Sequence, residues 1–293
     1  MNLSSLLTTA PLAILPSHAG PALAALGQAD ATRPGRRRMY QDKGEEGYDM
    51  AEDYSLAAQH NTARLMIQTV GNGTALICIK GMIIKNAPDW ACLESYCTSL
   101  TLLDLALDMV SQQGYSALIL QIESGGGSSL GLPETAARLR ALSSQGIRTT
   151  AYTSECCASA AYWIAAACDE IFAAPSAIVG SIGTYSVVTD YSEMLTAAGI
   201  KTEVFTAREA PLKTTGLPGT ALTDAQRADI QRHVDEVDLQ FLAHLAARRP
   251  ALNLDQAATG AWWNAASPTT PRGLVDDATI FHSLHDLLAI AAA

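Results

Sequence analysis

The sequence predicts an α/β fold in which helices cover a largely parallel β-sheet. The first observation is an alternation of short apolar segments with helical patterns from Leu65 onward, as in chains built of βαβ units. The second is composition, because 48% of the residues are hydrophobic and only 16% are charged, which is typical of closely packed layers. A chain of 293 residues is long enough to bury a large core.

The expected elements follow in order along the chain. Residues 65–70 and 74–79 are predicted strands joined by the tight turn Gly71-Asn72-Gly73. Leucines at helical spacing predict a helix over residues 97–113, and the apolar run 117–122 is typical of a buried parallel strand. The remaining expected elements are a helix over 134–145, a strand over 147–152, a helix over 158–167, short strands over 170–173 and 178–183, and a long helix over 224–248.

The first 63 residues differ from the rest. Residues 1–26 show weak helical periodicity around Leu12, Ile14 and Leu23, and residues 27–63 are polar, without an apolar period. We therefore predict an N-terminal extension and flexible linker over residues 1–63 and one domain over 64–293. Pro11 and Pro16 interrupt the only early apolar stretch, so neither a secretory signal nor a membrane anchor is expected, and the protein is predicted to be soluble and cytoplasmic.

Charge and cysteine content exclude several classes of function. The net charge of −10 argues against a nucleic-acid-binding protein, and the basic run at 36–38 is interpreted as a solvated stretch. Six cysteines without CxxC spacing or a histidine cluster indicate reduced, buried thiols. No metal or cofactor is expected.

Two segments have residues suited to catalysis. The glycine-rich segment 124–129 lies between a strand and a helix; it lacks a phosphate-binding pattern and is either an oxyanion hole or an ordinary flexible turn. Ser159 lies where a loop meets a helix of small residues. It is either a nucleophile placed in the positive potential of a helix N-terminus or a simple N-cap.

A serine nucleophile needs a base. None of the six histidines lies in a glycine-rich or loop motif, so a Ser-His-Asp triad has little support. Lysine is the other candidate, because burial favours its neutral amine. Lys213 is in a loop that precedes the long helix, although a loop lysine is more often merely solvated.

Five short motifs, taken together in order, resemble the S49 serine peptidases, the family of signal peptide peptidase A and the phage capsid proteases. The resemblance covers roughly residues 74–289. Its parts are Ser124-Gly125-Gly126-Gly127, Ala158-Ser159-Ala160-Ala161-Tyr162-Trp163, Val179-Gly180-Ser181-Ile182-Gly183 after residues 169–175, the loop of Lys213, Gly216 and Pro218, and Gly273-Leu274-Val275-Asp276.

The resemblance implies a role for each of the matching residues. Ser159 corresponds to the nucleophile, Lys213 to the general base, and Ser181 to a serine that orients the lysine. Gly126 and Gly127 correspond to the oxyanion hole. Gly125 stands where the family has proline, and the residues before Ser159 and Lys213 also depart from the family pattern, which puts rate and substrate preference in doubt.

The family resemblance also implies a ClpP/crotonase-like fold of repeated ββα units. Members with one set of motifs form homo-oligomeric rings in which two subunits supply the serine and the lysine of one site. The apolar residues of the late helix are then either subunit contacts or intrachain core: Leu239, Phe241, Leu242, Leu245 and the following Trp262-Trp263.

The segment from Pro11 to His18 is similar to the start of phage minor capsid protein C, which favours a prohead protease that cleaves scaffold or capsid proteins in the host cytoplasm. A bacterial signal peptide peptidase is the alternative within the family. From other classes, a crotonase-like acyl-CoA enzyme, which would use acidic residues, and a non-catalytic capsid component remain open.

Overall fold

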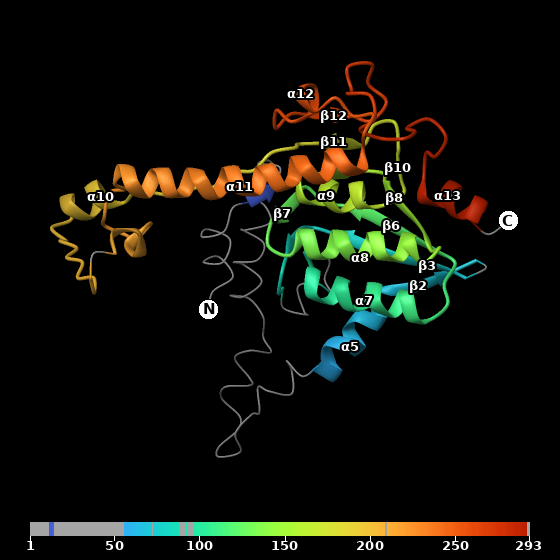
Figure 1. Ribbon diagram of the computed structural model, residues 1–293, viewed down its shortest axis with the longest axis horizontal. Coiled ribbons are helices and arrows are strands. Elements are labelled where there is room, and N and C mark those ends of the chain that lie inside the picture. The colour runs from blue at the N-terminus through green and yellow to red at the C-terminus, as the bar shows by residue number, and fades with distance from the viewer. Residues whose placement is uncertain are drawn as a thin grey trace, which may run out of the picture.

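A five-stranded sheet forms the centre of the molecule, in the order β10-β8-β6-β3-β2 (Figure 1). The computed structural model describes residues 12–14, 56–71, 73–87, 92, 96–208 and 210–291. The strands β3 (Thr74–Lys80), β6 (Ala117–Glu123), β8 (Arg148–Thr153) and β10 (Glu170–Ala173) are parallel to one another. Only β2 (Ile67–Val70), which forms the predicted hairpin with β3, is antiparallel. The predicted α/β fold with a largely parallel sheet is confirmed.

A repeated unit of two strands and a helix accounts for most of the chain. Each of the sheet strands β3, β6 and β8 is followed by a short strand outside this sheet and then by a helix. The short strands are β4 (Met82–Ile84), β7 (Gly126–Ser128) and β9 (Cys156–Ala158), and the helices are α7 (Leu100–Gln112), α8 (Leu132–Ser144) and α9 (Ala160–Ala167). A further short strand, β5 (Cys97–Ser99), precedes α7. The ββα repeat is therefore present.

The short strands form two small sheets beside the main one. In the first, β4 pairs in parallel with β5 and with β7. In the second, β11 (Ile178–Gly180) pairs in parallel with β9 and antiparallel with β12 (Trp262–Asn264). The small sheets therefore place the glycine-rich β7 and the turn after β9 at the same end of the repeated units.

Helix α9 is the centre of the core, because all eight of its residues are buried. The long helix α11 (Asp224–Arg248) crosses it, and the rings of Trp163 and Phe241 stack with centroids 4.6 Å apart. Phe241 and Leu245 thus belong to the intrachain core, whereas Leu239 and Trp262 are exposed. The intrachain-core interpretation therefore holds for Phe241 and Leu245, and the subunit-contact interpretation of the exposed residues stays a prediction.

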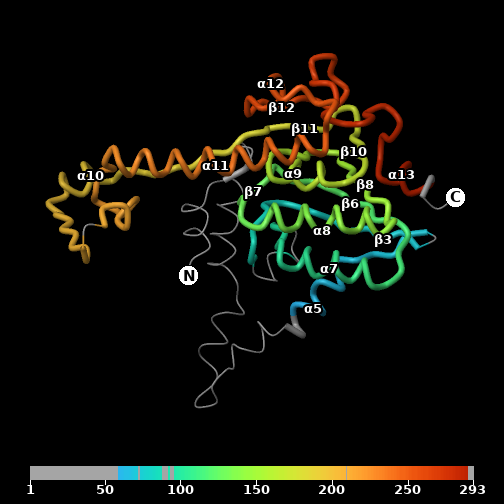
Figure 2. Tube along the Cα trace, viewed as in Figure 1, coloured from blue at the N-terminus to red at the C-terminus, as the bar shows by residue number. Residues whose placement is uncertain are grey.

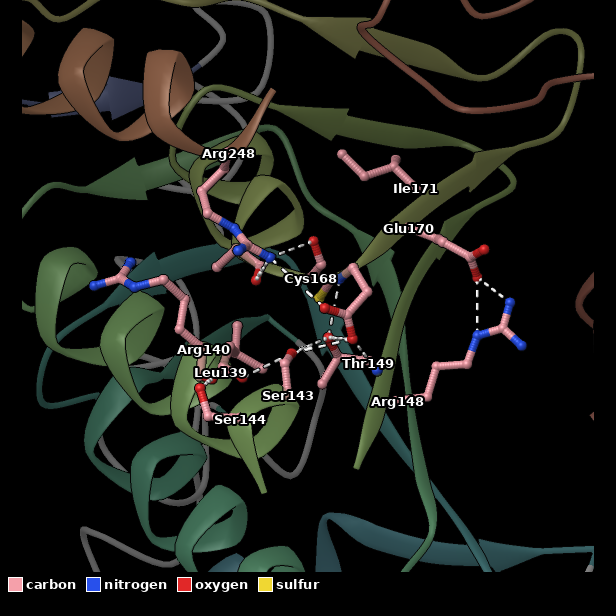
Figure 3. Close-up of polar contacts among 12 residues, drawn as sticks. Leu139, Arg140, Ser143, Ser144, Arg148, Thr149, Cys168, Glu170, Ile171 and Arg248 are labelled. Carbon is pink, nitrogen blue, oxygen red and sulfur yellow. Dashed lines mark hydrogen bonds and ion pairs between the residues drawn. The ribbon is translucent and has the colours of Figure 1, made fainter. Parts of the chain in front are cut away.

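Asp169, which follows α9, binds residues of α8 and β8. Its carboxylate accepts hydrogen bonds from the backbone N–H of Thr149 at 2.9 Å and from the hydroxyls of Thr149 and Ser143 at 2.9 and 3.0 Å. Figure 3 shows this region, with Arg248 reaching in from α11 and Arg148 bound to Glu170 at 2.6 Å. The residues that follow α9 therefore stabilise the framework, although they belong to a stretch whose sequence resembles the S49 peptidases.

The Gly-Leu-Val-Asp motif also serves the framework. Asp276 forms a bidentate ion pair with Arg249, with both N–O distances 2.9 Å, and accepts a hydrogen bond from the backbone N–H of Ile171 at 2.8 Å. The hydroxyl of Tyr162 donates to the carbonyl of Leu274 at 2.7 Å. The buried Arg249 and its ion pair with Asp276 therefore connect the end of α11 to β10. The bond from Tyr162 connects the same motif to α9.

Two elements within the N-terminal 63 residues differ from the prediction. Leu12–Ile14 form a strand, β1, rather than part of a helix, because they pair antiparallel with β7, a long-range contact that local periodicity does not reveal. Leu56–Leu65 form a helix, α5, which begins inside the predicted linker. It packs against α7, and Ala63 is fully buried in the core, so tertiary contact stabilises a segment with little apolar character.

Residues 185–208 and 210–223 form an arm that leaves the sheets along the N-terminal half of α11 (Figure 2). It contains α10 (Ser192–Ala197) and a short 3₁₀ helix, η1 (Pro211–Thr214). The remaining helices are α12 (Leu254–Ala257) and α13 (Leu284–Ala291). None of the described helices is both long and apolar enough to cross a lipid bilayer.

Candidate active site

Ser159 occupies the turn between β9 and α9 in a backbone conformation that serine rarely adopts. Its φ is 56° and its ψ is −120°. The predicted helix over 158–167 therefore begins two residues later than expected, with Ala158 in the strand and Ser159 in the turn. Strained conformations of this kind cost about 1–3 kcal/mol and cluster at functional sites.

The backbone of Ser159 is held from both sides, but its side chain does not cap the helix. The N–H donates to the carbonyl of Gly180 at 2.8 Å, and its carbonyl accepts from the N–H of Trp163 at 2.9 Å. Although Ser159 is the N-cap residue of α9, its hydroxyl makes no capping hydrogen bond. The simple N-cap interpretation thus fails, and the hydroxyl lies at the positive end of a helix.

Ser181 lies next to Ser159 in the structure. In the parallel pairing of β9 with β11, Ala158 is opposite Gly180, so the next residues of the two strands are Ser159 and Ser181. Ser181 is buried, has a φ of 51°, and donates its N–H to the carbonyl of Ala261 at 2.6 Å. Two buried serines with positive φ thus lie in neighbouring positions, each directly after one of two paired strands.

The glycine segment runs beside β9, the strand that precedes Ser159. Ser124 exchanges backbone hydrogen bonds with that strand, donating to the carbonyl of Cys156 at 2.7 Å and accepting from the N–H of Ala158 at 3.1 Å. The N–H of Gly126 donates to the Ser124 hydroxyl at 3.1 Å, and that hydroxyl donates to the carbonyl of Gly81 at 2.6 Å. Ser124 therefore shapes the turn, and the N–H of Gly126 is engaged within it.

Gly127 has a structural reason to be glycine. It pairs with Ile83 of β4, and a Cβ at this position would overlap the backbone oxygen of Ile83. Strand β7 also packs against α9, which keeps the glycine segment close to the start of that helix.

Glu123 is a supporting residue that sequence reasoning missed. Its carboxylate accepts hydrogen bonds from the backbone N–H groups of Ser154, Glu155 and Cys156 at 3.0, 2.8 and 3.2 Å. It also accepts from the Ser154 hydroxyl at 2.8 Å. Glu123 thus joins the glycine segment to the loop that leads into β9 and Ser159. The sequence signal that could have revealed Glu123 is its position as an acidic residue at the end of an apolar strand.

The cysteines before Ser159 do not compete with it as nucleophiles. Burial raises the pKa of Cys156 to about 12, and full burial raises the pKa of Cys157 well above its usual value. Both side chains are therefore neutral thiols at neutral pH, and a thiol is a weak nucleophile. All six cysteines lie within the described residues and none of them forms a disulfide there; four are buried, whereas Cys78 and Cys92 are partly exposed.

His244, which stacks on Trp163, is not available as a base. Its Nε2 lies 3.1 Å from the carbonyl of Trp163 and its Nδ1 lies 3.5 Å from Arg140 Nη1. A neutral ring that donates from Nε2 and accepts at Nδ1 satisfies both contacts. Burial lowers the pKa of His244 to about 4, so this neutral form persists at neutral pH.

The structure does not join Lys213 to Ser159 within one chain. Lys213 lies in η1 and is exposed, and none of the hydrogen bonds among the described residues joins the two side chains. Gln226 of α11 holds η1 by donating to the carbonyl of Pro211 at 2.8 Å. The loop after Ser181 contacts α11 at Val234, about 12 Å further along the helix, where the Thr184 hydroxyl donates to the Val234 carbonyl. Figure 1 shows the arm far from the start of α9.

With this geometry established, comparison with known proteins gives the family. The model of peptidase family S49 matches residues 141–293, which include Ser159, Ser181 and Lys213. The chain belongs to peptidase family S49. The glycine segment at 124–129 lies outside the matched range, so the correspondence of Gly126 and Gly127 rests on motif and geometry alone.

Two of the similar curated proteins are named as bacterial proteases. The probable protease SohB of Haemophilus influenzae is 30% identical over 146 residues, which are 50% of this chain and 41% of that protein. Protease 4 of Salmonella typhi is 24% identical over 231 residues, which are 76% of this chain and 34% of that protein. This S49 chain therefore spans less than half the length of either relative.

Distant likenesses are also found among solved structures. A serine-to-alanine mutant of the 1510-N membrane-bound stomatin-specific protease matches over 75% of this chain and 85% of its own, at 15% identity and a TM-score of 0.43. A member of the enoyl-CoA hydratase/isomerase family matches over 62% of this chain and 75% of its own, at 18% identity and a TM-score of 0.29.

Proposed function

We propose that the chain hydrolyses peptide bonds in proteins, with Ser159 as the nucleophile. One observation carries the proposal: the uncapped hydroxyl of Ser159 lies in a strained turn at the positive end of a buried helix. A structural serine at this position would cap the helix and would not need a positive φ. Membership of a peptidase family and the protease names of the relatives support the same reaction class.

The proposed mechanism uses a Ser-Lys pair. A neutral Lys213 Nζ removes the proton from Ser159 Oγ as this oxygen attacks the carbonyl carbon of the peptide bond. Backbone N–H groups of the glycine segment stabilise the oxyanion, for which we propose Gly126 and Gly127. The protonated lysine then donates its proton to the departing amine, and water hydrolyses the acyl-enzyme. Ser181 lies beside Ser159 and is proposed to orient the incoming lysine.

The lysine in this scheme comes from a second copy of the chain. A lysine acts as a base only when it is neutral, and burial is what favours the neutral amine. Lys213 is exposed on the arm, whereas Ser159 is 1% exposed. Docking of the arm of one copy over the site of the next would bury Lys213 and complete the pair. A head-to-tail contact of this kind closes into a ring when its rotation allows.

Exposed apolar side chains on the arm support such a contact. Phe205 is 89% exposed, and further large apolar residues of the same arm are also exposed: Val187, Tyr191, Met194, Ile200, Val204, Leu212 and Leu217. Apolar surface gathered on one projecting segment is typical of an interaction site. We therefore propose a homo-oligomer, which loses specific activity when it is diluted until it dissociates. Unchanged specific activity of the dissociated protein would contradict the shared site.

The reaction class is tested by labelling with a fluorophosphonate and measuring intact mass. Wild type is expected to gain one adduct, and Ser159→Ala and Lys213→Ala to gain none. Lys201→Ala is the matched control, because Lys201 is another exposed lysine of the arm. Labelling of a folded Ser159→Ala variant would refute the nucleophile, and labelling of Lys213→Ala at the wild-type rate would refute the base.

For the substrate, we propose scaffold or capsid proteins of a phage head, cleaved inside the host cytoplasm. Support comes from the similarity of residues 11–18 to the start of phage minor capsid protein C. The bacterial relatives, which are named as proteases, favour a second candidate, a cellular protease. The resemblance to signal peptide peptidase A makes signal peptides the proposed substrate of that candidate. Incubation with purified scaffold protein and with a synthetic signal peptide separates the two, because each candidate predicts cleavage of only one.

The acyl-CoA alternative has no support from the site. Such an enzyme would use acidic side chains, and Glu123, which directly precedes the glycine segment, is engaged by three backbone N–H groups. The solved enoyl-CoA hydratase/isomerase family member is only 18% identical to this chain, a likeness too distant to indicate a shared reaction.

A further inference from the structure

Strand β1 lies beside the glycine segment that we assign to the active site. Leu12, Ala13 and Ile14 pair antiparallel with Ser128, Gly127 and Gly126, respectively. Strand β7 is bound to β4 on its other side, so without β1 it would be the edge of that sheet. In Figure 1, β1 is the short dark-blue strand next to β7.

The direction of β1 brings it toward the nucleophile. Because the pairing is antiparallel, the chain runs from Leu12 opposite Ser128 to Ile14 opposite Gly126. Gly126 is two residues from Ser124, whose backbone is bonded to Ala158, the residue before Ser159. A strand entering along β7 in this direction therefore reaches the turn that bears the proposed nucleophile.

The sequence of this segment suits a short strand that occupies an edge. Pro11 and Pro16 flank it, and proline cannot donate to a ladder, so pairing is confined to the residues between them. The segment is uncharged, and its backbone can satisfy the N–H and C=O groups on the open side of β7 in the way that an added peptide strand does.

We propose that residues 12–14 are a tethered peptide ligand of the active site, which covers β7 and must leave before another peptide can bind there. The proposal rests on the proposed function and concerns the regulation of the same site. A tethered segment competes at an effective concentration on the order of 1 mM. Against a free peptide with a Kd of ~0.1 mM, this competition weakens apparent affinity about tenfold.

The test measures peptide binding rather than catalysis, so failure of the peptidase reaction does not affect it. The ligand is a fluorescein-labelled peptide with the sequence of residues 10–17, and the protein is the full chain with Ser159→Ala, which prevents turnover. In this background, Leu12→Pro is combined with Ala13→Pro. In an antiparallel strand, the backbone N–H of one of two neighbouring residues bonds to the partner strand, so the double substitution removes that hydrogen bond of β1 whichever residue makes it. Leu23→Pro with Ala24→Pro is the control, an identical pair outside β1.

Fluorescence anisotropy is expected to show about tenfold tighter peptide binding to the β1 variant than to the parent and the control. A scrambled peptide is expected to bind all three weakly. Equal affinity for the β1 variant and the parent, or tighter binding to the control as well, would overturn the proposal.

A reversible crosslink keeps the proposal testable if the proline variant does not fold. Leu12→Cys with Ser128→Cys joins two paired residues, and paired strand residues are close enough for a disulfide. After oxidation by oxidised glutathione, peptide binding is expected to disappear, and reduction is expected to restore it. Binding that persists in the crosslinked protein would refute the proposal, as would failure of these two cysteines to crosslink in the folded protein.

Discussion

Glu123 offers a sharp test of how the site is held. Replacement by glutamine keeps the size of the side chain and one acceptor oxygen, but removes the charge that three backbone N–H groups share. Replacement by alanine removes every acceptor. Both changes act on the loop before β9 and therefore on the position of Ser159, with no direct contact to a substrate.

The magnitude follows from the contacts. Hydrogen bonds to a charged group each contribute about 1.5–3 kcal/mol when buried, and less where water replaces them, as it does for this partly exposed loop. We expect a loss of about 1–2 kcal/mol of unfolding free energy for Glu123→Gln and about 3 kcal/mol for Glu123→Ala. For domains of this size, each kcal/mol lowers Tm by about 2–4 °C, so Glu123→Gln should melt about 2–8 °C lower.

The assay combines thermal melting with the rate of fluorophosphonate labelling, measured well below Tm. Misplacement of a reacting group by about 1 Å costs on the order of a hundredfold in rate, so slower labelling is expected from both variants. Glu155→Gln is the matched control, because Glu155 is exposed in the same loop and its side chain makes no hydrogen bond among the described residues. A Glu123→Gln variant with wild-type Tm and labelling rate would refute the reasoning.

Three further predictions concern single residues. Ser159→Gly is expected to raise the free energy of unfolding by about 1 kcal/mol in urea titrations, because glycine adopts a positive φ without strain. The same variant is expected to lose fluorophosphonate labelling. A variant less stable than wild type would contradict the inferred strain. Burial lowers the pKa of His244 from 6.5 to about 4. The contribution of its neutral ring to the free energy of unfolding is therefore complete above pH 6.5 and is lost as pH falls toward 4. Urea titrations should show a loss of about 3 kcal/mol over that range in wild type, but not in His244→Gln. Gly127→Ala should destabilise the protein by more than about 3 kcal/mol through its overlap with β4, whereas Gly146→Ala, which meets open space, should cost about 1 kcal/mol; equal Tm values would refute this.

Local patterns in the sequence predicted most of the main sheet. The apolar run at 117–122 and the hairpin around Gly71 lie close to the observed strands because buried strands and tight turns have strong local signals. The three-residue strands β4, β7 and β9 were harder to predict, since their stability comes from pairing between distant segments. Leu12–Ile14 shows the same limit, as its strand depends on β7.

The site could be predicted as a set of residues but not as an assembled pair. Ser159 and Ser181 meet because both follow strands that pair in parallel, and the motif order already placed each of them after a short strand. Glu123 was missed because its partners are backbone N–H groups, which leave no trace in residue identity. Lys213 lies on a projecting arm, and the position of such an arm relative to a second copy is not encoded in the local sequence.

The central claim, a site divided between two copies, is tested most directly by mixing inactive variants. Ser159→Ala and Lys213→Ala are each expected to be inactive alone. When equal amounts are dissociated and reassembled, about a quarter of the sites should combine an intact serine from one copy with an intact lysine from the next. Recovery of labelling near that fraction, confined to the Lys213→Ala chain, is the predicted result. A mixed assembly that stays unlabelled would contradict the account.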